Sequence, residues 1–295
     1  MNISPSIIKI LNLSKRFEQV AALDNVSFDI PHNSIFGILG SNGSGKSTLM
    51  RILAKLIMQW SGKIYFNDSE IKDSNNYLNY FGFIIESPCF YEYLSARKNL
   101  EIFCRLTATD PSRIDELFDM VDLLGRADEK VSHYSYGMKQ RLGIAQALLH
   151  DPQVLVLDEP NNGLDPVGIT QISDILFQLK EMGKTICIST HSLIEVDRLC
   201  TDVAILKKGK LLISDSIQEL NKNLRFYRIE AKNIDKAIVQ LKDYERIKIF
   251  FKQNNTILLS QHLKEKPLDL TINMLKGSSI KSIHKESRLI EFFYV

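Results

Sequence analysis

Long hydrophobic runs are missing from this sequence. No apolar stretch approaches the ~18–20 residues that a helix needs to cross a bilayer. The first residues, Met-Asn-Ile-Ser-Pro, also lack the basic-then-apolar pattern of a secretory signal. We therefore expect no transmembrane segment in this chain, so that any work at a membrane requires another chain to span it.

Cysteine is scarce, and its spacing excludes two classes of small domain. The four residues Cys89, Cys104, Cys187 and Cys200 are scattered with no Cys-x-x-Cys pair. This spacing argues against a structural zinc site and a disulfide framework, and it indicates a reducing compartment. Cys187 lies in an apolar run, as a buried free thiol would.

An excess of one charge is also missing from the chain as a whole. The 37 Lys and Arg against 35 Asp and Glu give a net charge of +2, so we expect no nucleic-acid partner. From Asn221 onward, however, fifteen basic residues face eight acidic ones, a balance of +7 that leaves −5 for residues 1–220. The basic tail is either a solvated surface or a face attracted to anionic lipid headgroups.

What the sequence does contain is a glycine-rich stretch, Gly-Ser-Asn-Gly-Ser-Gly-Lys-Ser-Thr, between the apolar run Ile35–Leu39 and a predicted helix at Leu49–Ile57. Strand, glycine loop and helix form the context in which this pattern cradles phosphate, and it disfavours a simple helix-capping turn. Glycines let successive N–H groups turn inward, and the helix start adds its positive end. The predicted nucleotide-binding residues are Gly40, Ser41, Asn42, Gly43, Ser44, Gly45, Lys46, Ser47 and Thr48.

Two residue types in and after this loop carry specific chemistry. Lys46 can reach the β- and γ-phosphates of a nucleotide, and the Ser47 hydroxyl can ligate Mg²⁺. Val154–Leu157 is a continuous apolar run, typical of a buried parallel strand, and it ends in Asp158-Glu159. Asp158 is placed as the Mg²⁺-associated carboxylate of nucleoside triphosphatases, and the adjacent Glu159 is available as a general base.

Three further candidate residues lie at or beside other predicted strands. His191 ends the buried strand Thr185–Thr190 and could hold the γ-phosphate or the attacking water. Phe17 is predicted in a basic turn between two short strands, where it is either an edge core residue or a platform for an adenine ring. Glu86 follows the strand Phe81–Ile85 and is either a ligand-contacting carboxylate or a solvated loop residue.

Between residues 90 and 150 the pattern becomes helical. Ser95 is predicted to cap one helix and Asp110-Pro111 to start another. Ser135 and Gly137 precede a third helix, whose start offers a hydroxyl and N–H groups to an anion. We therefore expect an all-helical insertion at about 88–150 in an α/β domain, followed by a tight turn and helix start at Asn162–Pro166.

A polar stretch at residues 214–224 marks the predicted domain boundary. Beyond it the pattern predicts strands at Phe226–Glu230, Ile247–Phe251, Thr256–Leu259, Ile280–His284 and Leu289–Val295, with helices at Ile234–Leu241 and Leu268–Leu275. This order predicts a small α+β domain of the split βαβ kind over residues 216–295. No chemical motif indicates its task, which we expect to be regulatory or stabilising.

Five motifs occur in this order: the loop Gly40–Ser47, the signature-like Ser135-Tyr136-Gly137-Met138, the Asp158-Glu159 pair, the turn Asn162–Asp165 and His191. Together they resemble an ABC-transporter ATP-binding subunit. The resemblance covers about residues 7–215. It implies a P-loop NTPase core of ABC type over residues 1–215, with an antiparallel β subdomain and a helical subdomain. It also implies ATP and Mg²⁺ as cofactors, hydrolysis coupled to transport, membrane permease partners and a peripheral location on the cytoplasmic face of the membrane.

The resemblance also implies roles for individual residues. In that family two subunits meet head to tail, so that Lys46 and Ser47 of one copy and Ser135 and Gly137 of the other contact the same ATP. By the same resemblance, the roles are an adenine platform for Phe17, a metal ligand for Asp158, the catalytic carboxylate for Glu159, the switch histidine for His191, and nucleotide-site positions for Asp165 and Glu86.

The sequence departs from the usual family pattern at Tyr136 and Met138, which replace a glycine and a glutamine, and at Glu86, which replaces a glutamine. Residues 86–91 and 136–141 resemble the branch that serves bacitracin resistance and lantibiotic self-protection, which predicts export of a peptide antibiotic. The alternative is a soluble ABC-type ATPase acting on ribosomes or DNA. One cassette and no sustained heptads disfavour it.

Overall fold

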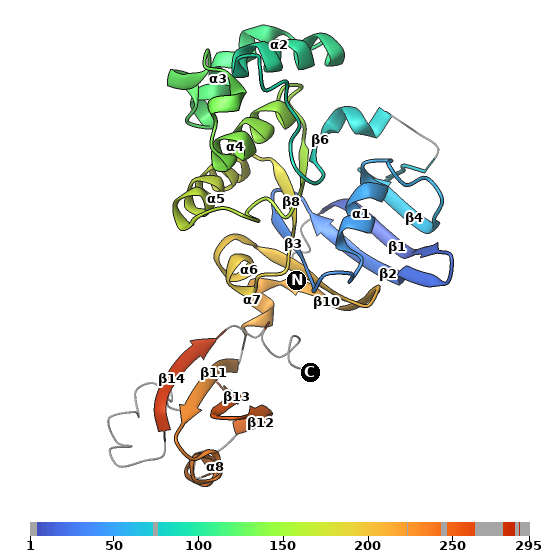
Figure 1. Ribbon diagram of the computed structural model, residues 1–295. Coiled ribbons are helices and arrows are strands. Elements are labelled where there is room, and N and C mark those ends of the chain that lie inside the picture. The colour runs from blue at the N-terminus through green and yellow to red at the C-terminus, as the bar shows by residue number, and fades with distance from the viewer. Residues whose placement is uncertain are drawn as a thin grey trace. The chain divides into compact units, whose positions relative to one another are not determined.

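The computed structural model describes residues 5–72, 76–222, 224–242, 247–262, 280–286 and 289. It divides the chain into two compact units, Met1–Ser214 and Asp215–Val295 (Figure 1). The first unit combines a mostly parallel sheet, an antiparallel sheet and a helical insertion, which confirms the predicted α/β fold class.

The central sheet of the first unit has six strands in the order β10-β9-β3-β8-β7-β6. The bounds are β3 Ile35–Leu39, β6 Phe81–Ile84, β7 Val154–Asp158, β8 Thr185–Thr190, β9 Asp202–Lys207 and β10 Lys210–Ser216. Pairing is parallel from β6 through β7, β8 and β3 to β9. All side chains of β3 and β8 are buried, because helices and a second sheet cover both faces. The carboxyl ends of these parallel strands therefore meet at one edge, where the polar residues follow.

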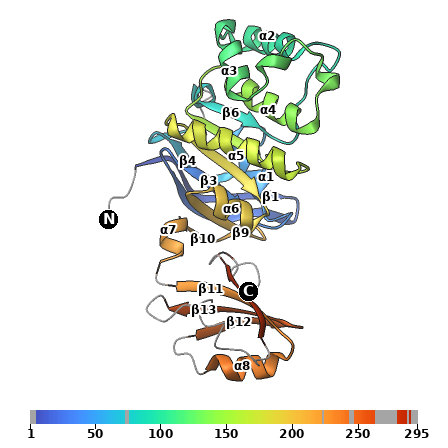
Figure 2. The same cartoon turned by 90° about the vertical axis from the view of Figure 1, so that its left-hand side faces the viewer.

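Three helices flank this sheet, as Figure 2 shows for α5 and α6. Helix α1 (Lys46–Leu53) contacts β7, α5 (Pro166–Glu181) contacts β8, and α6 (Leu193–Leu199) contacts β3. Helix α1 begins three residues earlier than predicted, directly on the glycine loop, with Gly45 at its N-cap. It ends at Leu53, whose carbonyl accepts a hydrogen bond of 2.9 Å from the Tyr77 hydroxyl, so the predicted extension to Ile57 is wrong.

A second, antiparallel sheet has the order β2-β1-β4-β5. Its strands are β1 Ser6–Phe17, β2 Val20–Pro31, β4 Ser61–Phe66 and β5 Ser69–Glu70. The first two strands are much longer than predicted, and Phe17 is the last residue of β1, paired with Val20, and not part of a turn. Register shifts along β1 break the alternation of apolar and polar side chains, and this is why the sequence pattern indicated two short strands.

The segment between β6 and β7 is helical, in agreement with the prediction. It contains α2 (Ala96–Thr107), α3 (Ile114–Met120) and α4 (Tyr136–Ala147), with short 3-10 helices at Pro111–Arg113, Leu124–Arg126 and Val131–His133, and a further one precedes β6 at Asn76–Tyr80. Ser95 caps α2 by accepting a hydrogen bond from the Lys98 amide. Asp110 caps the 3-10 turn that leads into α3, as the Asp110-Pro111 pattern predicts.

The second unit is built on a four-stranded antiparallel sheet in the order β12-β13-β11-β14. Its elements are α7 Ile217–Leu220, β11 Leu224–Ala231, α8 Ile234–Lys242, β12 Ile247–Gln253, β13 Thr256–His262 and β14 Ile280–Glu286. Buried Tyr227, Ile229, Ile257 and Leu259 form its core with Ala237 of α8. From β11 onward the described elements run strand, helix, strand, strand and strand, which agrees with the predicted split βαβ pattern as far as the described residues reach. The predicted helix Leu268–Leu275 and the strand predicted from Leu289 to the end lie outside the described residues, apart from Leu289.

Candidate active site

The glycine loop after β3 is held in shape by its neighbours. The Gly40 amide donates to the Thr190 carbonyl at 3.2 Å, and the Ser44 amide to the Ser41 carbonyl at 3.1 Å. Gly45 has a φ of 110°, and a Cβ there would overlap the Ala22 carbonyl and lie 2.8 Å from the Leu23 side chain. A Cβ at Gly40 would overlap Ser44 Oγ. Only glycine fits these two positions, so the sequence itself shapes the loop.

Lys46 places a buried cation inside this loop. The side chain is 4% exposed, and Nζ donates to the Gly40 carbonyl at 2.8 Å and to the Ser41 carbonyl at 3.3 Å. Ser44 Oγ is buried beside it and has no hydrogen-bond partner among the described residues. A buried ammonium, an unpaired hydroxyl and a curled backbone fit the phosphate groups of a nucleotide.

The remaining residues of the loop differ in how far they are exposed to solvent. Ser41, Asn42 and Gly43 are exposed at the tip of the loop. Ser47 and Thr48, in the first turn of α1, are partly buried. The Ser44 carbonyl accepts a hydrogen bond of 3.0 Å from Gly209, in the β9–β10 turn.

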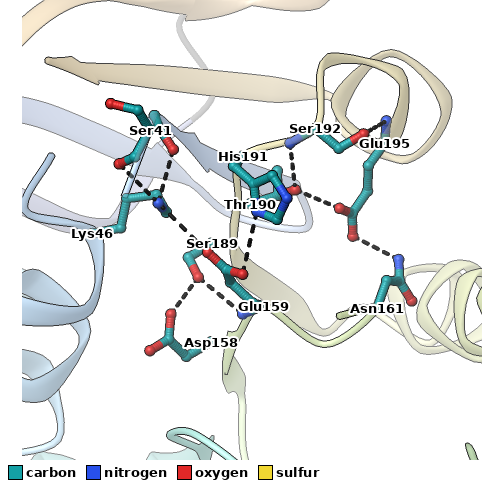
Figure 3. A network of polar contacts seen from close by, with 11 residues as sticks. Ser41, Lys46, Asp158, Glu159, Asn161, Ser189, Thr190, His191, Ser192 and Glu195 are labelled. Carbon is teal, nitrogen blue, oxygen red and sulfur yellow. Dashed lines mark hydrogen bonds and ion pairs between the residues drawn. The ribbon is translucent and has the colours of Figure 1, made fainter. Parts of the chain in front are cut away.

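The two carboxylates at the end of β7 differ in their surroundings (Figure 3). Asp158 accepts a short hydrogen bond from Ser189 Oγ, and the same Oγ accepts from the Glu159 amide at 2.9 Å. Glu159 has a left-handed φ of 47°, which ends the strand. One Glu159 oxygen lies 3.6 Å from Lys46 Nζ, and the other lies 3.3 Å from His191 Nδ1. Lys46, Glu159 and His191 thus form one network, which Ser189 links to Asp158.

The donor set suits magnesium only in combination with a substrate. No group of three His, Cys, Asp or Glu side chains in the described residues could hold a metal alone. Mg²⁺ usually binds through one or two carboxylates together with substrate phosphates. The Asp158 carboxylate and the Ser47 hydroxyl, beside a phosphate loop, are compatible with that type of site.

A second polar cluster, which sequence analysis missed, adjoins this network. Glu195 accepts hydrogen bonds from Asn161 Nδ2 at 2.6 Å and from Thr190 Oγ1. Burial raises the pKa of Glu195, and the two hydrogen bonds partly oppose that shift. The signal in the sequence was the capping pattern Ser192-x-x-Glu195. Ser189 was also missed, and a serine within the otherwise apolar β8 could have indicated it.

The three predicted site residues at the starts of α4 and α5 lie outside both clusters. Ser135 caps α4 by accepting from the Met138 amide at 3.2 Å, and a Cβ at Gly137 would lie 3.5 Å from the Leu164 side chain. Asp165 caps α5 by accepting from the Gly168 amide at 2.7 Å. Among the described residues, no hydrogen bond or ion pair joins these residues to Lys46 or Glu159.

Phe17 and Glu86 also make contacts of their own. Phe17 is 47% exposed, and Lys15 Nζ lies 4.8 Å above its ring centroid. Glu86 is exposed, has a left-handed φ of 68° and pairs with Arg51 of α1. The Phe17 ring is thus exposed enough to stack on a ligand, whereas the Glu86 carboxylate is already paired with Arg51.

Comparison with known proteins identifies the family. Residues 23–162 match the family model described as "ABC transporter". The bacitracin transport ATP-binding protein BcrA of Bacillus licheniformis is 35% identical over 98% of this chain and 96% of its own length. The lantibiotic transport ATP-binding protein SrtF of Streptococcus pyogenes is 39% identical over 74% of this chain and 96% of its own.

Solved structures agree on the fold. An ATP-binding cassette of an ABC transporter in its ADP conformation covers 72% of this chain with a TM-score of 0.67 at 22% identity, over 92% of its own length. CbiO1 of Clostridium perfringens, part of an ABC transporter complex, covers 73% with a TM-score of 0.66 at 27% identity, over 94% of its own length. In the described residues no helix is long and apolar enough to cross a membrane. The chain belongs to the ATP-binding subunits of ABC transporters and carries the ATP-binding, ATP-hydrolysing domain of that family.

Proposed function

We propose that this subunit powers a separate membrane permease that exports a peptide antibiotic of the bacitracin or lantibiotic class. Two relatives at 35% and 39% identity are named for bacitracin and lantibiotic transport. The bacitracin relative aligns over 98% of this chain, so the likeness extends through the C-terminal unit. Neither of these relatives is named for work on ribosomes or DNA, which is the alternative function.

The observation that carries the proposed chemistry is the position of Glu159 between Lys46 and His191. Its two oxygens lie 3.6 Å from Lys46 Nζ and 3.3 Å from His191 Nδ1. A carboxylate at this place can accept a proton from water that attacks the γ-phosphate. We assign Glu159 as the general base and His191 as the residue that orients it or holds the γ-phosphate.

Lys46 binds the phosphates in this proposal. Its ammonium is paired with loop carbonyls and Glu159, and a phosphate oxygen offers a stronger, charge-assisted partner. Ser47 and Asp158 would hold Mg²⁺, which would neutralise charge on the phosphates during transfer. The backbone N–H groups of residues 45–48, at the start of α1, would also bind the phosphates.

A second copy of this chain completes the site in our proposal. Ser135 and Gly137 lie at the positive end of α4 and have no bond to the phosphate loop of their own chain within the described residues. Two copies arranged head to tail would bring this helix start to the nucleotide of the partner. Phe17 would stack on the adenine, and Asp165 would hold the turn beside the interface. Glu86 would sit where nucleotide binding meets the permease, on the cytoplasmic face of the membrane.

Resistance of cells tests this function. Cells that carry this subunit with the permease encoded beside it are challenged with bacitracin and a panel of lantibiotics, with Glu159→Gln as the matched inactive subunit. We expect protection against these peptides that disappears with Glu159→Gln. An intact ATPase that gives no protection against any of them would exclude the antibiotic branch and leave the family assignment in place.

A further inference from the structure

Glu195 uses both carboxylate oxygens to join two loops of the active site. Oε1 accepts from Asn161 Nδ2, two residues after Glu159, and Oε2 accepts from Thr190 Oγ1, next to His191 (Figure 3). The Thr190 carbonyl in turn accepts from the Gly40 amide of the phosphate loop. One partly buried side chain therefore contacts the loop that follows Glu159 and the strand end that precedes His191, and Thr190 links it to the phosphate loop.

The contacts differ from those that the local sequence predicts. In a capping box, the glutamate at the third helical position bonds to the backbone N–H of the N-cap residue. Here Ser192 caps α6, but its own amide donates to Thr190 Oγ1 at 3.0 Å. Because Thr190 takes over the capping contact, both oxygens of Glu195 are used between loops.

We propose that Glu195 is a positioning residue for ATP hydrolysis, which fixes the loop that carries Glu159 relative to the loop that carries His191. The proposal rests on the roles of Glu159 and His191 given above. Asn161 Oδ1 is buried without a hydrogen-bond partner among the described residues, so Glu195 alone sets the orientation of this amide. Without the two hydrogen bonds of Glu195, the distance between Glu159 and His191 would no longer be fixed, while the phosphate loop stays formed.

Glu195→Gln is a sharp test because both partners of the carboxylate are donors. The amide has no charge and only one acceptor oxygen, so at most one of the two hydrogen bonds survives as it is. The other is remade only if the Asn161 amide or the Thr190 hydroxyl turns round, and then without the charge of the carboxylate. We expect kcat for ATP to fall about tenfold, with the dissociation constant for ATP and the midpoint of thermal unfolding nearly unchanged. Glu219→Gln is the matched control, since Glu219 holds the same position in α7 after the cap Ser216 but, in the part of the chain that the structure describes, pairs only with exposed Lys222.

The double variant Asn161→Asp with Glu195→Gln exchanges the roles of donor and acceptor between these two side chains. The new amide can donate to the new carboxylate while its oxygen still accepts from Thr190, so both hydrogen bonds return. We expect this double variant to regain most of the lost kcat, and Asn161→Asp alone to lose more than Glu195→Gln because two carboxylates then face each other. A purely structural role would not produce this reciprocal rescue.

Three results would overturn the inference. The first is a kcat for Glu195→Gln equal to that of Glu219→Gln, and the second is a loss of kcat that the double variant does not reverse. The third is a loss of ATP affinity and a drop in the unfolding midpoint that accompany the loss of kcat, because they indicate general damage. Glu159→Gln is assayed alongside in the full chain. If it hydrolyses ATP at the wild-type rate, the proposed roles fail; if it is inactive while Glu195→Gln is normal, only this inference fails.

Discussion

Replacing Lys46 by methionine isolates the charge in the phosphate loop. Methionine keeps most of the length of the side chain but removes the ammonium, which donates to the Gly40 and Ser41 carbonyls and lies 3.6 Å from Glu159. Without nucleotide the change should be tolerated, because the Glu159 side chain is 23% exposed and can be solvated. With nucleotide, the loss of charge-assisted bonds to the phosphates should be severe.

The size of the effect follows from ligand linkage. At an ATP concentration 100 times the dissociation constant, binding stabilises the folded protein by about 2.7 kcal/mol. For a unit spanning Met1–Ser214, each kcal/mol raises the unfolding midpoint by about 2–4 °C, which gives a shift of about 5–10 °C. Removing a hydrogen bond from a charged donor costs about 1.5–3 kcal/mol, so the loss of two such bonds in Lys46→Met should weaken binding at least ~100-fold. The remaining stabilisation is then about 0.4 kcal/mol, or ~1 °C.

The assay is thermal unfolding of the full chain with and without ATP. Lys184→Met is a suitable control, because Lys184 pairs with Asp151 at 2.7 Å and its side chain is 14% exposed. We expect this control to lower the midpoint without ATP while keeping the ATP-dependent shift. A Lys46→Met protein that keeps a shift of several degrees would refute the assignment of Lys46 to the phosphates.

Three further predictions concern the same unit. Glu159→Gln should lower kcat by about 10²–10⁴-fold in a steady-state ATPase assay and leave ATP affinity within twofold, and unchanged turnover would remove Glu159 from the catalytic role. Gly45→Ala should destabilise the unit by on the order of 1–3 kcal/mol in denaturant unfolding, since its φ of 110° and the Ala22 carbonyl exclude a Cβ. The hydrogen bond from Lys184 lowers the pKa of Asp151. The pair therefore stabilises the folded protein fully above the ordinary pKa of 3.8, and this stabilisation is lost as pH falls through the lower folded-state pKa. Asp151→Asn should therefore flatten acid unfolding in that range, and an identical pH profile would contradict this account.

Some parts of the structure could be predicted from the sequence because their causes are local. The strands β3, β7 and β8 have continuous apolar runs, and parallel strands covered on both faces require this composition. Ser95 and Ser135 accept from backbone amides at the helix starts where their sequence pattern placed them. Phe17 could not be placed, because the bulges of β1 interrupt the alternation that such predictions depend on.

The contacts of Ser189 and Glu195 depend on pairing between distant segments, which no local pattern contains. Asp158 of β7 lies opposite Ser189 of β8, and Leu39 of β3 lies opposite Thr190. Since side chains alternate between the two faces of a strand, a slip of one residue would turn Ser189 away from Asp158. The same slip would move Thr190 away from the Gly40 amide, and it would move the segment that carries Glu195 away from Asn161. The phosphate loop is therefore encoded in one contiguous stretch, whereas the contact between Glu195 and Asn161 depends on the register of the sheet.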